Sequence, residues 1–190
     1  MSYQNILHFW FGKPEDADYG EPRQFWFVKN FNVDVQIKSR FESTYQAAAR
    51  GKLNHWRSSA LSCLALIIVL DQFPRNMYRG QPQAFATDNR ALKIAQFAVE
   101  QEYDQQLLPV QRWFVYLPFE HSENLADQET AMKLFSTLKD DPNSQRSIDY
   151  ARKHLQVIQR FGRFPHRNQI LGRENTSEET AFLQQPGSKF

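Results

Sequence analysis

The chain has 190 residues, of which 41% are hydrophobic and 14% aromatic, so it can bury a core within one domain and is not intrinsically disordered. The single cysteine, Cys63, excludes an intramolecular disulfide, and no Cys/His framework has the spacing of a zinc site. The net charge of +2 is too small to indicate a general nucleic-acid binder.

The N-terminus and the apolar runs predict the location of the protein. The first residues, MSYQNILHFWFGK, lack the basic region and the small-residue cleavage site of a signal peptide. The longest apolar run, residues 60–70, is far shorter than the roughly 20 residues that a membrane-spanning helix needs. We therefore expect a cytoplasmic protein that does not act on a membrane.

The first half of the chain predicts helices in order. Residues 33–50 carry apolar side chains at every third or fourth position, which is typical of a helix with one buried face, and Gly51 ends it. Ser58 or Ser59 can cap the next helix. That helix is apolar on nearly all sides and is expected to end at Phe73, before Pro74, so we expect it to be the central, fully buried helix.

The second half continues the pattern. Amphipathic or apolar helices are predicted near residues 84–101, 109–117, 124–138, 147–161 and 176–184, with Thr87 or Asp88 as a cap of the first. No segment alternates polar and apolar residues, so we expect no sheet. Short connections favour antiparallel neighbours. The sequence therefore predicts a single all-α domain, residues 1–190, of stacked antiparallel helical hairpins.

A related motif follows three of these helices. The motifs read FPRN, LPFEHSE and FPHRN, and their prolines, at positions 74, 118 and 165, are 44 and 47 residues apart. This spacing is close to that of two-helix repeats. If proline ends each helix and the hairpins stack in register, the polar residues beyond the prolines meet at one rim of the fold.

The first motif places Asp71 near the end of an apolar helix, where the helix dipole disfavours a carboxylate. Such a position calls for a cationic partner, and Arg75, Arg163 and Arg167 are the candidates. Either a structural ion pair or a ligand site would satisfy the pattern.

The second motif, around Glu120 and His121, contains acid and base groups. Its spacing matches neither HExxH nor the Glu-x-x-His pair of di-iron bundles, so we predict no metal. We expect no ligand role for the isolated His8, His55 and His154, the last of which we place in solvent or at a cap.

The third motif lies in a basic stretch. Residues 146–173 contain seven Lys or Arg residues and one acid, a local charge of +6, which leaves −4 for the rest of the chain. Aromatic residues between the arginines superficially suit single-stranded nucleic acid. Because the excess charge is local, we favour a tether, in which Phe161 and Phe164 enter the core and the arginines pair with acids elsewhere.

The segments LALIIVLDQFPRNMYRG, AFATD, LPFEHSENLADQE and RFGRFPHRNQILGRE together resemble the bacterial family of unknown function DUF924 over nearly the whole chain. The resemblance implies a TPR-like α-α superhelix and brings no known activity or cofactor. The residues that fill the family's motifs, and that we take as candidate ligand-binding residues, are Asp71, Arg75, Asn76, Glu120, His121, Glu123, Asp127, Arg163, His166, Arg167 and Asn168.

Two functions fit these clusters. In the first, arginines hold an anionic small molecule while His121, Glu120 or His166 supplies acid and base chemistry, so that the domain could be an enzyme. In the second, the clusters are internal salt bridges of a helical-repeat scaffold that binds a protein or peptide through a separate apolar groove.

Overall fold

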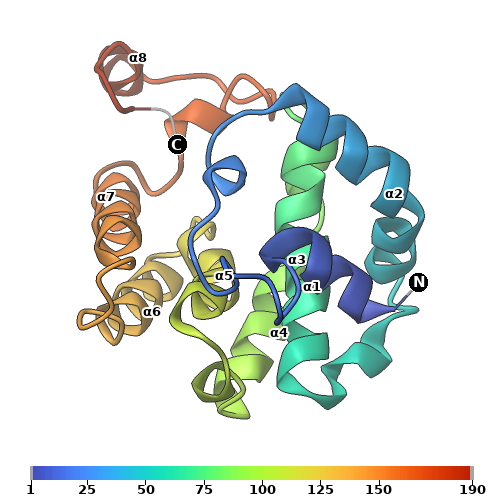
Figure 1. Ribbon diagram of the computed structural model, residues 1–190. Helices are drawn as coiled ribbons and strands as arrows, with labels where there is room; N and C mark the ends of the chain where they lie inside the picture. The colour runs from blue at the N-terminus through green and yellow to red at the C-terminus, as the bar shows by residue number, and fades with distance from the viewer. Residues whose placement is uncertain (1, 189–190) are drawn as a thin grey trace.

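The computed structural model describes residues 2–188 and contains eight α-helices and no strand among them, which confirms the all-α prediction (Figure 1). Five short 3-10 turns lie between the helices, and the last of these, η5 (Pro165–Arg167), carries part of the third motif. The helices are α1 (Tyr3–Phe11), α2 (Phe31–Ala49), α3 (Ala60–Met77), α4 (Asp88–Glu100), α5 (Pro109–Glu120), α6 (Leu125–Ser136), α7 (Gln145–Phe161) and α8 (Ser177–Leu183).

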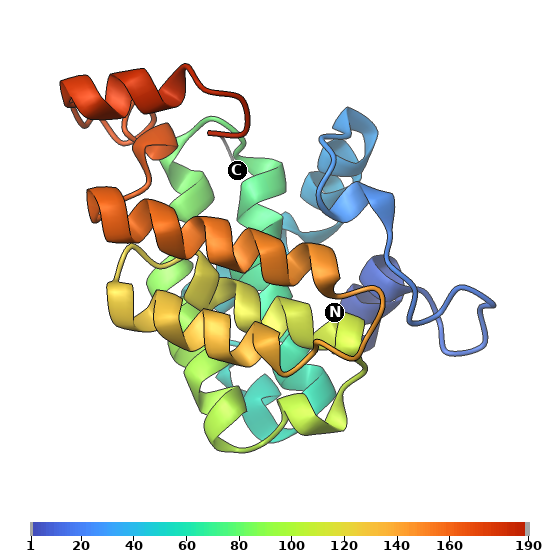
Figure 2. The ribbon, with the colours of Figure 1, turned by 90° about the vertical axis from the view of Figure 1, so that its left-hand side faces the viewer.

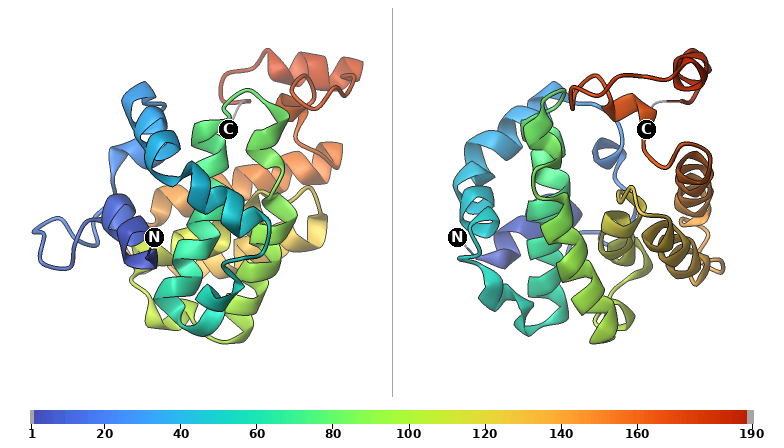
Figure 3. Two further views of the ribbon diagram at one scale, coloured as in Figure 1. Left: turned by 90° about the vertical axis from the view of Figure 1, so that its right-hand side faces the viewer. Right: turned by 180° about the vertical axis from the view of Figure 1, so that it is seen from behind.

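The centre of the fold is α3, as its apolar surface predicts. Every residue from Ser62 to Pro74 is buried, and α1, α2, α4 and α5 all pack against this helix (Figures 1 and 3). By length and composition α3 is the one described helix that could cross a membrane, but 83% of it is buried inside the fold. Its hydrophobicity is therefore that of a core helix.

Neighbouring helices in the sequence are also neighbours in space. Each helix from α2 to α7 packs against the next one along the chain, and α6 and α7 lie side by side (Figure 2). Short connections between helices produce this order. The packing brings the end of α3, the start of α4, the end of α5 and the segment around η5 to one region of the molecule.

Helix ends follow the predicted capping chemistry in most places. The Ser59 side chain accepts from the amide of Ser62 at the start of α3, and Thr176 and Glu179 form the reciprocal capping box of α8. Thr87 precedes α4 but makes no cap bond, because its hydroxyl donates to the carbonyl of Leu70 at 2.6 Å. At the start of α6, the Asn124 side chain accepts from the amides of Ala126 and Asp127, without a reciprocal bond from Asp127.

The prediction that proline ends each helix was wrong for two of the three motifs. Pro74 and Pro118 lie inside α3 and α5, which continue to Met77 and Glu120. Proline removes only its own amide donor, and near the end of a helix the lost bond can be tolerated. As a consequence Asp71 and Arg75 lie one turn apart on the same helix, and Glu120 is still helical.

Candidate functional site

The centre of the site is Asp71, whose side chain is fully buried in α3. Its Oδ1 lies 2.8 Å from Nδ1 of His121, at the end of α5, and 3.4 Å from Nη1 of Arg75. Its Oδ2 accepts from the side-chain amide of Gln72 at 2.6 Å. Burial opposes the negative charge, but Arg75 and His121 outweigh it and hold the pKa of Asp71 well below its usual range.

His121 is oriented by this contact. Because an ionised carboxylate only accepts, Nδ1 of His121 donates to Asp71. Within residues 2–188 the other ring nitrogen, Nε2, has no hydrogen-bond partner and is not fully covered, and the side chain as a whole is 14% exposed. Burial and the charge of Arg75 lower the pKa of His121, which favours the neutral ring. The lone pair of Nε2 is then available to accept a proton.

Two arginines converge on Asp88, the first residue of α4. Arg75 binds both carboxylate oxygens, at 2.8 and 3.0 Å, and also donates to the carbonyl of Asp71 at 2.7 Å. Arg167, in η5, approaches the same carboxylate at 3.7 Å, too far for a hydrogen bond. Both oxygens of Asp88 thus accept hydrogen bonds from Arg75, and Arg167 makes only a longer ion pair with the same carboxylate.

Arg167 is the less satisfied of the two cations. It is only 6% exposed, and its guanidinium carbon lies 4.8 Å from the ring centre of Phe85 and 4.5 Å from that of Phe164. Among the described residues its Nε has no acceptor. Burial and repulsion from Arg75 lower the pKa of Arg167 to about 10. A buried guanidinium with this environment favours an additional anion.

A second buried pair lies behind His121. Oε1 of Glu120 is 3.0 Å from Nδ1 of His154 on α7, and the same nitrogen is 2.9 Å from the carbonyl of Tyr150. Burial and the charge of Asp71 raise the pKa of Glu120 to about 8, and burial lowers the pKa of His154 to about 3. The surroundings of both groups thus favour their neutral forms. The expectation that His154 is solvated or a cap was wrong, because α7 turns this side chain into the fold.

Glu123 and His166 lie beside this centre and have other contacts. Glu123 binds Arg173 through both oxygens, at 2.6 and 2.9 Å, and accepts from the amide of Phe164 at 2.8 Å. Burial and the charge of Arg167 lower the pKa of His166 to about 4. The tether interpretation was right that Phe164 is buried, but Phe161 is only half-buried, and both rings pack in a small cluster with Val157 and Ile158 that is separate from the main core.

Four of the sequence candidates have their hydrogen bonds away from the centre. The side-chain amide of Asn76 donates to Asp34 on α2 at 2.7 Å, and the carboxylate of Asp127 accepts from Ser122 at 2.6 Å. The remaining two belong to the C-terminal segment, where Arg163 pairs with Glu179 at 2.6 and 2.8 Å, and Asn168 donates to Asn175 at 2.7 Å.

Several residues of the site were not found from the sequence. Asp88 stands in the segment AFATD, which the sequence analysis noted only for its capping signal and family resemblance. Phe85, from the same segment, covers both arginines. Arg173 carried no local signal, because its partner Glu123 lies 50 residues away. Glu179 has a local role in the capping box of α8, and that role gives no indication of its pairing with Arg163. Among residues 2–188, no three His, Cys, Asp or Glu side chains form a group that could hold a metal ion.

Comparisons with known proteins agree with this architecture. A solved structure of a protein of unknown function from Agrobacterium tumefaciens is similar, with 38% sequence identity, a TM-score of 0.85 and coverage of 96% of each chain. No curated protein matches the sequence. The family model described as a bacterial protein of unknown function, DUF924, matches residues 6–187. The chain therefore belongs to the DUF924 family.

Proposed function

We propose that this domain binds an anionic small molecule next to His121 and that His121 acts on it as a general base. The observation that carries the proposal is the pairing of His121 with buried Asp71, which leaves Nε2 without a hydrogen-bond partner within residues 2–188 and not fully covered. A histidine held by a carboxylate in this way has a fixed tautomer and a free lone pair. The same arrangement recurs in sites that abstract protons.

The anion would be held by the arginines of the site. Arg167 is buried, and its guanidinium makes no hydrogen bond within residues 2–188, whereas Arg173, whose Nε is likewise unpartnered, binds Glu123. Arg75 contacts both Asp71 and Asp88, and Asp88 is the carboxylate that Arg167 also approaches. A guanidinium binds carboxylates and phosphates through two parallel hydrogen bonds. Arg163, by contrast, already has a carboxylate of its own in Glu179, so we leave it out of the binding set.

The test compares the two classes of arginine. We would measure binding of inorganic phosphate, acetate and citrate by NMR shifts and by thermal stabilisation, in the native sequence and in Arg167→Met. The control is Arg173→Met, which removes an arginine of similar size that has Glu123 as its partner. We expect at least one anion to shift the His121 resonances and to lose this effect in Arg167→Met only. Equal binding in all three proteins, or none in any, would contradict the proposal.

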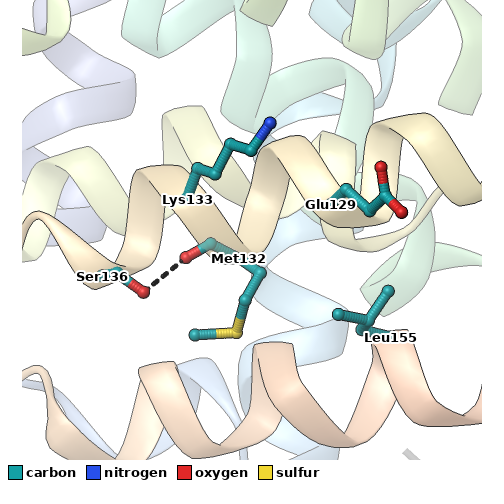
Figure 4. Close-up of a pocket in the computed structure, with 5 residues that line it drawn as sticks. All are labelled: Glu129, Met132, Lys133, Ser136 and Leu155. Carbon is teal, nitrogen blue, oxygen red and sulfur yellow. Dashed lines mark hydrogen bonds between the residues drawn. The ribbon is translucent and has the colours of Figure 1, made fainter.

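A second function, a scaffold for a protein or peptide, is favoured by a different observation. A shallow surface hollow of about 480 Å³ lies between α6 and α7, away from the polar centre, and Met132 and Leu155 supply its apolar lining (Figure 4). A scaffold would bind its partner there and use the polar clusters only as braces. Replacing Met132 and Leu155 by Lys would then abolish capture of the partner without changing anion binding.

A further inference from the structure

Two buried carboxyl groups of the site have very different partners. Asp71 is fully buried but receives hydrogen bonds from His121 and Gln72 and faces the charge of Arg75. Glu120 is 3% exposed, and its Oε1 has Nδ1 of His154 at 3.0 Å. Its Oε2 is buried and has no hydrogen-bond partner within residues 2–188. A carboxylate without donors is costly to bury, so these surroundings favour the protonated form of Glu120.

The groups that face Glu120 do not supply a compensating positive charge. Asp71 approaches from α3 and adds a negative charge, while His154 approaches from α7 with an N–H that it shares with the Tyr150 carbonyl. From α6, the neutral amide of Gln128 donates to the backbone carbonyl of Glu120 at 2.5 Å. His121 follows Glu120 in the chain and points to Asp71. Each element packed around Glu120 therefore disfavours or fails to stabilise its ionised form.

We propose that Glu120 is a positioning residue for His121: it stays protonated in the folded protein, so that it adds no negative charge to those of Asp71 and Asp88, which already act on the imidazole. A further carboxylate there would favour the imidazolium and put a proton on Nε2. Two carboxyl groups whose surroundings separate their protonation states divide the acid and base roles of a site. The purpose of this arrangement rests on the proposed function, but the protonation state is testable without any ligand.

The first experiment compares Glu120→Gln, a neutral side chain of the same shape, with the native sequence by urea unfolding between pH 5 and 8. A carboxyl group whose pKa is higher in the folded than in the unfolded state loses stability as the pH rises between the two values. We therefore expect the unfolding equilibrium constant of the native protein, relative to that of Glu120→Gln, to rise by up to about tenfold per pH unit. Parallel stability curves would overturn the proposal.

The matched control is Glu129→Gln on the exposed side of α6, which makes the same chemical change outside the site. Its stability curve is expected to run parallel to that of the native sequence. If Glu120→Gln does not fold, the infrared spectrum of the native protein gives the answer. A carboxylic acid band present at pH 6 and lost by pH 9 supports the proposal, and its absence at pH 6 contradicts it.

The link to His121 needs its own measurement. If Glu120 is neutral, Glu120→Gln leaves the titration midpoint of the His121 ring, followed by NMR, unchanged. If Glu120 is ionised near neutral pH, removing its charge lowers that midpoint, and the positioning role is wrong. Both results can be obtained without a ligand, so a failure of anion binding at Arg167 and a failure of this proposal are distinguishable.

Discussion

The arginines of the polar centre, Arg75 and Arg167, and two arginines of the C-terminal segment, Arg163 and Arg173, have opposite environments. In the C-terminal segment each cation has a carboxylate of its own, since Arg163 binds Glu179 and Arg173 binds Glu123 with two short hydrogen bonds. At the polar centre Arg75 and Arg167 share Asp88 unequally. The two carboxylate-bound arginines explain how the segment is attached to the fold, whereas Arg167, which hydrogen-bonds no carboxylate within residues 2–188, has capacity for a ligand.

Asp71→Ala is expected to have the largest effect, because it removes the group on which the polar centre is built. Asp71 is fully buried, and its loss leaves Arg75 and His121 without their shared partner. Breaking a buried ion pair in this way costs about 3–5 kcal/mol of unfolding free energy. Urea unfolding at pH 7 measures it. The control Asp149→Ala removes a surface carboxylate. An equal loss of unfolding free energy in the control would mean that the buried contacts of Asp71 do not contribute more to stability than a surface ion pair.

Arg173→Met tests the pair that Arg173 forms with Glu123 and is expected to have an intermediate effect. It removes two charge-assisted bonds to Glu123 and one to the carbonyl of Phe164, while Glu123 keeps its bond from the Phe164 amide. Losing hydrogen bonds to a charged group of this kind costs about 1.5–3 kcal/mol. Chemical unfolding gives the value. Loss of anion binding in this variant would contradict the assignment of a structural role to Arg173 and of anion binding to Arg167.

Arg160→Ala is expected to have the smallest effect. Arg160 pairs with Glu178 at 2.8 Å, but the two side chains are 48% and 60% exposed. Exposed ion pairs of this kind contribute about 0–1 kcal/mol. A thermal denaturation curve close to that of the native sequence is the expected result. A large loss of stability would show that the exposure of an ion pair does not indicate how much it contributes to the stability of this fold.

The helices were predictable because their signals are local. Apolar periodicity gave α2 and α7 to within two residues of their ends, and Ser59 was one of the two caps expected for α3. Proline was misleading for the same reason. Its local meaning is a helix stop, but Pro74 and Pro118 lie in the last turn of their helices, where the loss of one amide donor is tolerated.

The site was predictable only in part. The sequence proposed a cationic partner for Asp71 and included Arg75, which is correct, but it did not predict the contact with His121, 50 residues away. His154 was expected in solvent or at a cap because it is polar, although its spacing from Ala151 and Ile158 puts it on the apolar face of α7. Asp88 had a sufficient local explanation as a cap, so nothing in the sequence pointed to its arginine partners.

The most direct test of the account is the tautomer of His121 at pH 7, read from the two ring nitrogens by 15N NMR. We predict that Nδ1 of His121 carries a proton, which it donates to Asp71, and that Nε2 is unprotonated and takes up a proton only at lower pH. Asp71→Asn should weaken this preference. A proton on Nε2 at pH 7, with Nδ1 bare or both nitrogens protonated, would contradict it, because His121 would then have no lone pair facing the ligand.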